Sequence, residues 1–194
     1  MSEQQHSSQL FMVREDISTL PALTLPAGYG VRSLQPGDEK AWEHIINDSF
    51  GGNHPFDREM ASDEPYTPER VWFITDEQDV PIATASAWFR PQFGESTGYL
   101  HMVGLLQSQG GKKLGLYVSL AALLHMAREG FTRAVLNTDD YRIPAVKTYL
   151  NLGFVPVCTD SGHHARWQAL ANKLNCSIDV IQLDGTPLVL EPHS

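Results

Sequence analysis

The sequence is poor in cysteine, in basic side chains and in long apolar runs. Its 194 residues include two cysteines, too few for a disulfide framework, so we expect reduced thiols in a cytoplasmic protein. The formal net charge of −9 argues against nucleic acid or an anionic membrane as the main partner, because both select clustered Lys and Arg. No apolar run approaches the length of a membrane span, and the N-terminal residues lack the features of a signal peptide.

Familiar nucleotide-binding and metal-binding motifs are missing as well. No Ser or Thr follows Lys112-Lys113 at P-loop spacing, and no G-x-G-x-x-G motif is present, which excludes a P-loop hydrolase and a dinucleotide oxidoreductase. One cluster contains residue types that bind metals, but its spacing matches no standard zinc pattern. We therefore expect no metal site at this cluster, which comprises Cys158, Asp160, His163 and His164.

The most informative stretch alternates strands with helices. Apolar runs of strand length enclose a loop with paired glycines and a helix that Gly130 ends. A second helix follows, with Pro144 in its first turn, Asp140 as a plausible N-cap and Gly153 beyond its end. The expected elements are a strand at 99–106, a loop at 107–113, a helix at 114–129, a strand at 133–137 and a helix ending at Leu152.

The flanking sequence adds an antiparallel part to this pattern. A strand at 29–34 precedes a helix with Trp42, Ile45 and Ile46 on one face, and the strands at 71–75 and 81–89 form a hairpin. Further strands and one helix are expected after residue 153. We assign residues 1–27 to an N-terminal tail and edge segment, which includes a short strand at Leu10 to Val13, and residues 28–194 to one α/β (mixed α+β) domain.

The glycine loop between a strand and a helix suggests an anion site. Free backbone N–H groups and the positive end of the helix dipole point to one spot there, which suits a phosphate or pyrophosphate. Glycine-rich loops also occur as purely structural turns, so the loop alone is compatible with an anion site and with a simple turn.

The helix before Gly153 carries a pattern of the form A-x-x-x-Y-x-x-x-G-F, at Ala145, Tyr149, Gly153 and Phe154. With the preceding strand, loop and helix, it resembles the GNAT N-acetyltransferase superfamily. The resemblance implies a single GNAT-like domain with a mixed, mostly antiparallel sheet, splayed central strands and flanking helices. It also implies acetyl-CoA as co-substrate.

The coenzyme loop matches the family less well than the helix does. The family pattern Q/R-x-x-G-x-G/A falls on residues 110–115, where Gly110 replaces Gln or Arg, Lys113 replaces the middle glycine, and Gly115 matches. By resemblance, backbone N–H groups around Val103 and Leu105 hold the thioester carbonyl, and a bulge at Gly104 starts the splay or only relieves crowding. The expected coenzyme-binding residues are Val103, Leu105, Gly110, Gly111, Lys112, Lys113, Leu114, Gly115 and Arg142.

Tyr149 and His101 are the predicted catalytic residues. By resemblance Tyr149 lies near the coenzyme sulfur, and a phenol suits protonation of a thiolate. The alternative is a purely structural role, in which Tyr149 packs against the sheet. His101 can take a proton near neutral pH, although a lone histidine on an apolar strand is more often structural. Glu95, Tyr99 and a water chain are weaker candidates for the base.

These features predict an acetyl-CoA-dependent N-acetyltransferase that acts on a primary amine of a small molecule or a protein by direct attack. The alternative is a GNAT-fold binding or sensor module that has lost normal coenzyme binding, which the replacements at Gly110 and Lys113 keep open. Oligomeric state cannot be read from the sequence, and a homodimer is compatible with it.

Overall fold

The computed structural model describes residues 8–193. Residues 1–7 of the predicted N-terminal tail and residue 194 lie outside the described part. The chain divides into two compact units. Unit 2 comprises Glu15–Ala134, and the described part of unit 1 comprises residues 8–14 and 135–193.

Unit 2 is built around four antiparallel strands in the order β2-β3-β4-β5. Short helical turns connect several of its elements, at Asp57–Ala61, Pro68–Arg70, Pro91–Phe93 and Gln107–Gln109. The strands are β2 (Gly30–Ser33), β3 (Val71–Thr75), β4 (Pro81–Phe89) and β5 (Thr97–Leu105), and the helices are α1 (Glu39–Phe50) and α2 (Leu114–Arg128).

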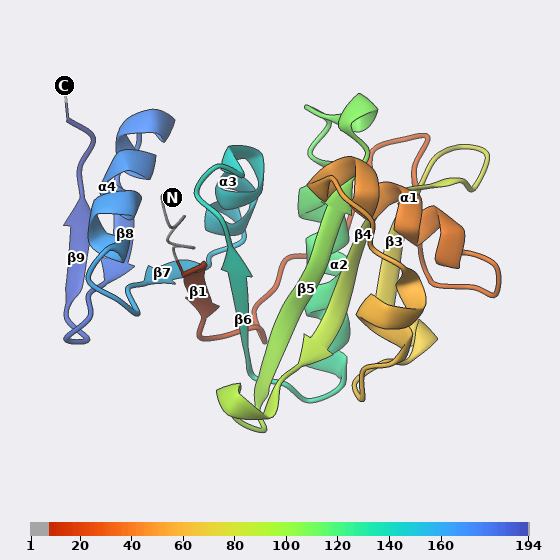
Figure 1. Ribbon diagram of the computed structural model, residues 1–194, viewed down its shortest axis with the longest axis horizontal. Helices are drawn as coiled ribbons and strands as arrows, with labels where there is room; N and C mark the ends of the chain where they lie inside the picture. Colours follow the sequence, from red (N-terminus) through yellow and green to blue (C-terminus); the bar gives the residue numbers. More distant parts are fainter. Residues whose placement is uncertain (1–7, 194) are drawn as a thin grey trace, which may run out of the picture. The chain divides into compact units, whose positions relative to one another are not determined.

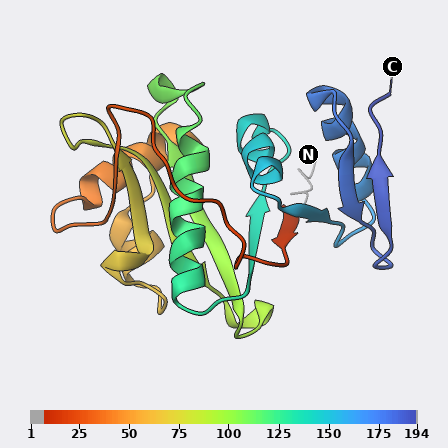
Figure 2. The ribbon, with the colours of Figure 1, turned by 180° about the vertical axis from the view of Figure 1, so that it is seen from behind.

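The two helices of unit 2 cover opposite faces of its strands (Figures 1 and 2). The face of α1 formed by Trp42, Ile45 and Ile46 is completely buried, as its i, i+3, i+4 spacing predicts. Helix α2 is apolar around most of its circumference and buries eight side chains, which suits a helix that crosses the middle of a sheet. Burial of each large side chain contributes about 1.5–3 kcal/mol, so both helices are held mainly by packing.

Unit 1 contains β1 (Leu10–Arg14), α3 (Ile143–Asn151), β7 (Val155–Val157), α4 (His163–Leu174), β8 (Ile178–Ile181) and β9 (Pro187–Leu190). Strand β6 (Arg133–Thr138) crosses into it from unit 2. The strand order is β6-β1-β7-β8-β9. The β7–β8 pair is parallel, whereas β1–β7 and β8–β9 are antiparallel.

Strand β1 is not the edge strand that the sequence predicts. It lies between β6 and β7, pairs Phe11 with Val157, and buries Leu10 and Met12 completely. A strand position in the interior of a sheet suits so apolar a segment, and its partners are distant in sequence. Local pattern therefore could not place it.

The other expected elements are present within a few residues of their predicted bounds, and the mixed, mostly antiparallel fold is confirmed. One detail is wrong. Helix α3 takes Arg142, not Asp140, as its N-cap residue, with Pro144 in the first turn, and Asp140 instead accepts a 2.7 Å hydrogen bond from Arg166 Nε. None of the helices in residues 8–193 is long and apolar enough to cross a membrane.

Candidate active site

Strand β5 has an irregularity near its C-terminal end. The pairing with β4 shifts between Thr84–Gly104 and Ser86–His101, so Met102 and Val103 face one residue of β4. Met102 adopts φ +48°, a left-handed conformation that costs an L-residue about 1–3 kcal/mol. Such a bulge redirects backbone groups away from regular pairing, at the segment where the sequence predicts the carbonyl-binding N–H groups.

Gly104 does not form this bulge. It pairs with Thr84, and a Cβ added to it would lie 2.8 Å from Ile46 Cδ1 and 3.2 Å from Ile45 Cγ2. The glycine therefore allows α1 to approach β5 closely. Of the two interpretations that the sequence leaves open, the relief of crowding is confirmed and the bulge at Gly104 is wrong. Met102 gives no sequence signal for its conformation.

The loop after β5 turns sharply into α2. Gly111 has φ +80°, and Lys113, the N-cap residue of α2, has φ +60° and ψ 17°. Glycine adopts this left-handed conformation at little cost, which explains why the family pattern places glycine at this position. Lys113 supplies the same backbone geometry with a side chain attached.

The turn leaves a row of backbone donors unused. Within residues 8–193, the N–H groups of the five consecutive residues 111–115 make no hydrogen bond to another residue, whereas Gly110 N–H donates to the Gln107 carbonyl and Leu116 N–H to the Lys113 carbonyl. Consecutive free N–H groups at a helix N-terminus form a concave anion-binding surface. Such a surface can bind a phosphate or diphosphate group, and the Lys112 ammonium lies on the same loop.

Helix α1 fixes the start of this loop. Gln107 N–H donates to Asp48 Oδ2 at 2.6 Å, and Gln107 Nε2 donates to the Asp48 carbonyl at 2.6 Å. Two bonds to one residue fix both the backbone and the side chain of Gln107. Sequence reasoning did not single out Asp48, because nothing in its local pattern distinguishes it from an ordinary exposed acid of α1.

An aromatic row follows the α1 side of β5. The His101 ring lies 5.3 Å from that of Tyr99 and 5.7 Å from that of Trp88, and Phe93 continues the row 5.6 Å from Tyr99. The spacing follows from the pleat, which places alternate residues of a strand on the same face. No hydrogen bond joins the His101 ring to another residue of the described chain.

Charged groups border the row. Asp63 accepts hydrogen bonds from Trp88 Nε1 at 2.9 Å and pairs with Arg90 Nη1 at 2.6 Å, while the Arg90 guanidinium lies 6.0 Å from the Tyr99 ring centre. Burial and then the Arg90 charge lower the pKa of His101 to about 4, against the opposing effect of Asp63 and Glu59. His101 is therefore a neutral imidazole near pH 7.

Burial also acts on two neighbours of His101. It raises the pKa of the Tyr99 phenol, so Tyr99 stays protonated and is a poor base. The hydrogen bonds from Trp88 and Arg90 hold the pKa of Asp63 below its usual value, although burial opposes them. Sequence analysis missed Asp63 and Arg90, which lie 38 and 11 residues before His101 in the chain.

The pattern around Tyr149 has a clear structural meaning. Gly153 takes φ +76° after α3, its N–H donates to the Leu150 carbonyl, and Phe154 N–H donates back to the Tyr149 carbonyl at 3.0 Å. These bonds close the helix as glycine-terminated helices do. The rings of Tyr149 and Phe154 meet edge to face with centres 6.2 Å apart, and Tyr149 is 3% exposed.

The predicted site residues divide between the units. Tyr149 and Arg142 lie at the end and the start of α3 in unit 1. The remaining predicted residues belong to unit 2, where β5 and the loop bring them into one continuous segment. They are His101, Val103, Leu105, Gly110, Gly111, Lys112, Lys113, Leu114 and Gly115. Their roles in binding and catalysis, and the splay of the central strands, stay predictions.

The cluster of metal-binding residue types near α4 forms local structural bonds. Asp160 accepts hydrogen bonds from Gly162 N–H at 2.8 Å and from the Ser8 hydroxyl. The fully buried His163 ring accepts a 3.2 Å bond from Thr159 N–H at Nδ1. In residues 8–193 no group of three or more His, Cys, Asp or Glu side chains is arranged to hold a metal ion.

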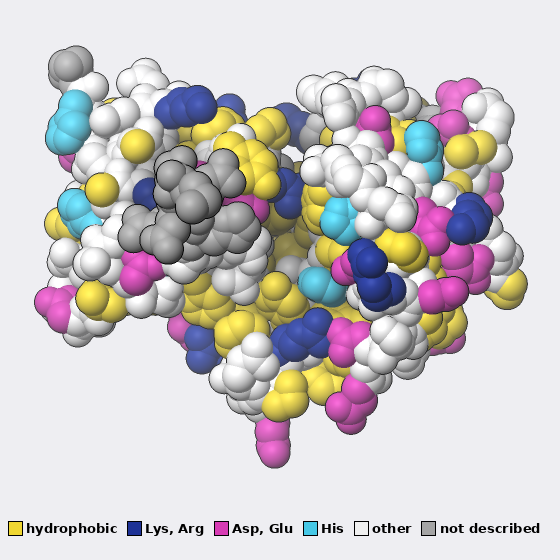
Figure 3. Space-filling model, viewed as in Figure 1, with side chains coloured by type: hydrophobic (Ala, Val, Ile, Leu, Met, Phe, Trp, Pro, Cys, Tyr) yellow, Lys and Arg dark blue, Asp and Glu magenta, His cyan; other side chains and the backbone are white. Residues whose placement is uncertain are grey.

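The visible surface of unit 2 carries a mixture of side-chain types. Figure 3 shows acidic and basic side chains interspersed with histidines and apolar groups on the part of this face that belongs to unit 2. Such a surface offers both hydrogen-bonding and apolar contacts to a small ligand.

Comparison with known proteins identifies the family. Residues 39–154 match the family model for "Acetyltransferase (GNAT) family". The chain is 28% identical over 163 residues to a mycothiol acetyltransferase of Frankia casuarinae, covering 75% of this chain and 46% of the relative. It is 29% identical over 169 residues to a mycothiol acetyltransferase of Actinosynnema mirum, covering 83% and 53%. The chain thus spans about half the length of these curated relatives.

Solved structures of other acetyltransferases have the same fold as this chain. A GCN5-related N-acetyltransferase from Sphaerobacter thermophilus has a TM-score of 0.59 at 18% identity, covering 77% of this chain and 49% of that one. The ribosomal-protein-S18-alanine N-acetyltransferase of Escherichia coli has a TM-score of 0.53 at 17% identity, covering 64% and 76%. The family match extends from α1 through the bulged strand, the loop and α2 to the end of the Tyr149 motif. The chain therefore belongs to the GNAT acetyltransferase family.

Proposed function

We propose that this chain is an acetyl-CoA-dependent N-acetyltransferase whose acceptor is a primary amine. The observation that carries the proposal is the row of five unused N–H groups at residues 111–115, at the N-terminus of the 15-residue helix α2. The oxygens of a diphosphate can accept hydrogen bonds from these N–H groups. The family membership makes acetyl-CoA the candidate that carries this diphosphate.

The bulge in β5 supports a role in holding the thioester. The positive φ of Met102 turns the chain at Val103 out of register with β4. Strain of this kind persists where the surrounding structure enforces it, and it often marks a functional site. A donor directed at the carbonyl oxygen would stabilise the oxyanion that forms when the amine attacks.

The reaction needs two proton transfers. The amine nitrogen forms a bond to the thioester carbon, the carbon–sulfur bond breaks, the nitrogen loses a proton, and the departing thiolate gains one. We assign the second transfer to the Tyr149 hydroxyl, on the strength of the family motif in which it stands. General acid catalysis of this kind contributes typically about 10²–10⁴-fold.

His101 is the side chain that we propose to contact the attacking amine. Its imidazole is neutral near pH 7 because its pKa is lowered to about 4, so it is always available to accept a hydrogen bond from the amine. The same low pKa makes it a weak base. We therefore propose that His101 orients the amine by accepting a hydrogen bond from it, and that solvent takes up the proton.

The class of acceptor is a primary amine of a small molecule or of a protein. The names of the relatives and structural neighbours include enzymes of both kinds, for mycothiol and for a ribosomal-protein alanine. The aromatic row offers ring faces against which a cationic group can pack. This arrangement favours an acceptor that joins an ammonium to an apolar or ring-shaped body.

Calorimetric titration with acetyl-CoA and with free coenzyme A tests the coenzyme part of the proposal. Both should bind and raise the melting temperature, because a ligand that binds only the folded state stabilises it by mass action. A panel of amines, amino sugars and amino-acid amides, followed by thiol release, then identifies the acceptor. Absence of coenzyme binding at millimolar concentration would refute the proposal and favour a GNAT-fold binding or sensor module.

A further inference from the structure

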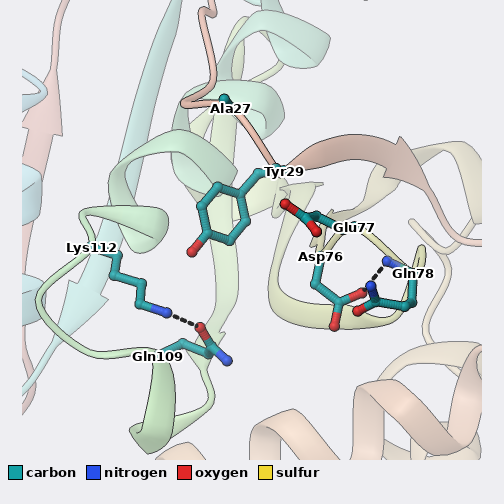
Figure 4. Close-up of a pocket in the computed structure, with 8 residues that line it drawn as sticks. Ala27, Tyr29, Asp76, Glu77, Gln78, Gln109 and Lys112 are labelled. Atoms are coloured by element: carbon teal, nitrogen blue, oxygen red, sulfur yellow. Dashed lines mark hydrogen bonds between the residues drawn. The ribbon is translucent and has the colours of Figure 1, made fainter.

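A pocket of about 250 Å³ lies beside the coenzyme loop in unit 2 (Figure 4). Three segments enclose it. They are the residues before β2, which contribute Tyr29; the turn between β3 and β4, which contributes Asp76, Glu77 and Gln78; and the loop before α2, which contributes Gln109 and Lys112. The Tyr29 side chain and the Lys112 side chain extend towards the same space from opposite walls in Figure 4. The pocket thus combines an aromatic ring, carboxylates and an ammonium group.

The acidic wall has one occupied and one available carboxylate. Asp76 Oδ1 accepts bonds from Gln78 N–H at 3.0 Å and Val80 N–H at 2.9 Å, so Asp76 shapes the turn. The Glu77 side chain makes no hydrogen bond or ion pair to another residue within residues 8–193. Its Oε1 lies so close to Gly28 that an added Cβ there would be 2.8 Å away. Gly28 has φ +86°, and the Glu77 side chain lies so close to it that residue 28 has no room for a side chain.

The basic wall belongs to the proposed diphosphate site as well. Lys112 Nζ donates to Gln109 Oε1 at 2.8 Å, which holds the ammonium at the rim of the pocket. The backbone N–H of Lys112 is one of the five unused donors. A ligand whose diphosphate occupies those donors therefore has the pocket as the adjacent binding space on the Lys112 side.

We propose that this pocket binds the adenine base of the coenzyme, an inference that rests on the proposed function. The base lies against the Tyr29 ring, and its exocyclic amino group donates to the Glu77 carboxylate. The negative charges of Asp76 and Glu77 repel phosphate, so the phosphate groups lie at the opposite, Lys112 side. The pocket thereby adds affinity for the nucleotide end of acetyl-CoA and selects a base with an amino donor at this position.

Two ligands separate this pocket from the rest of the coenzyme site. In 1,N6-etheno-coenzyme A the amino group of the base is blocked, and 4′-phosphopantetheine lacks the nucleotide entirely. Calorimetric titration of the unaltered protein should give an affinity for etheno-coenzyme A about tenfold lower than for coenzyme A, the loss expected for one hydrogen bond to a charged group.

Variants assign the loss to named side chains. Glu77→Ala should weaken coenzyme A binding by about tenfold and abolish the preference over the etheno analogue. Tyr29→Leu should weaken both nucleotide ligands by removing the ring. Both variants should bind 4′-phosphopantetheine as the unaltered protein does. Glu69→Ala, which removes an exposed carboxylate of another turn in unit 2, is the matched control and should change nothing.

The outcomes distinguish the two proposals. If the unaltered protein binds none of the three ligands, the proposed function fails. If it binds coenzyme A but both pocket variants stay within twofold of it, coenzyme binds elsewhere and the adenine assignment is wrong. Weaker binding of phosphopantetheine by the pocket variants would show that they disturb the loop, and would equally overturn the assignment.

Discussion

The pH dependence of stability gives a direct test of the environment of His101. Its pKa is about 4 in the folded protein against about 6.5 for an unperturbed histidine. Above pH 6.5 the side chain is neutral in both folded and unfolded chains. Between pH 6.5 and 4 the unfolded chain takes up a proton that the folded chain rejects, so the free energy of unfolding falls as pH falls.

The size of the effect follows from the same numbers. The difference between the two pKa values corresponds to about 3 kcal/mol, or about 1.4 kcal/mol for each pH unit crossed. Solvent reaches the half-buried ring and reduces this maximum, so we expect about 1–3 kcal/mol. Three charged groups act on His101 with opposing signs, namely Arg90, Asp63 and Glu59. The pKa of about 4 in the folded protein already includes the effects of all three groups.

The assay compares urea unfolding of the unaltered protein with that of His101→Phe and His101→Gln at several pH values from 7 to 4. His101→Phe keeps a ring in the aromatic row, and His101→Gln keeps polarity, but neither variant titrates. Carboxylate titrations are common to all three proteins and largely cancel in the difference. The unaltered protein should lose about 1–3 kcal/mol relative to both variants over this range. Parallel pH profiles would refute the reasoning.

Three further predictions concern single positions. Tyr149→Phe should lower turnover by about 10²–10⁴-fold with little change in coenzyme affinity; equal single-turnover rates would reduce Tyr149 to a packing residue. Lys113→Gly should raise the free energy of unfolding by up to about 1 kcal/mol by relieving the left-handed residue, whereas Lys113→Ala should not; a loss of stability on Lys113→Gly in urea unfolding would contradict the strain. Gly104→Ala should destabilise the protein by about 1–3 kcal/mol, because its Cβ would overlap Ile46, and an unchanged midpoint of urea unfolding would show that α1 shifts at no cost.

Local pattern was sufficient for most of the fold. The helix around Trp42 and the helix ended by Gly130 follow from the spacing of apolar residues and from glycine stops, which depend only on neighbours in the chain. Strand β1 shows the limit of this approach. Its interior position depends on pairing with β7, about 145 residues later, and the propensity of five residues carries no information about such a partner.

The candidate site was predictable to a different degree in each part. The loop and Tyr149 could be found from the sequence, because the glycines of the loop and the residues that end α3 form recognisable short patterns. Met102 could not, since its left-handed conformation is imposed by the surrounding sheet. Asp63 and Arg90 reach His101 through tertiary structure alone, so their effect on its pKa has no counterpart in the linear sequence.

The pair of hydrogen bonds between Asp48 and Gln107 makes the last turn of α1 and the start of the coenzyme loop move together. Opening the loop requires breaking both bonds or displacing the helix end. Ligand binding at the loop should therefore slow hydrogen exchange at the Gln107 amide and at the C-terminal turn of α1 together, although these residues are 59 positions apart in the chain. Substitutions that fray the end of α1 become a means of changing coenzyme affinity without touching a coenzyme contact.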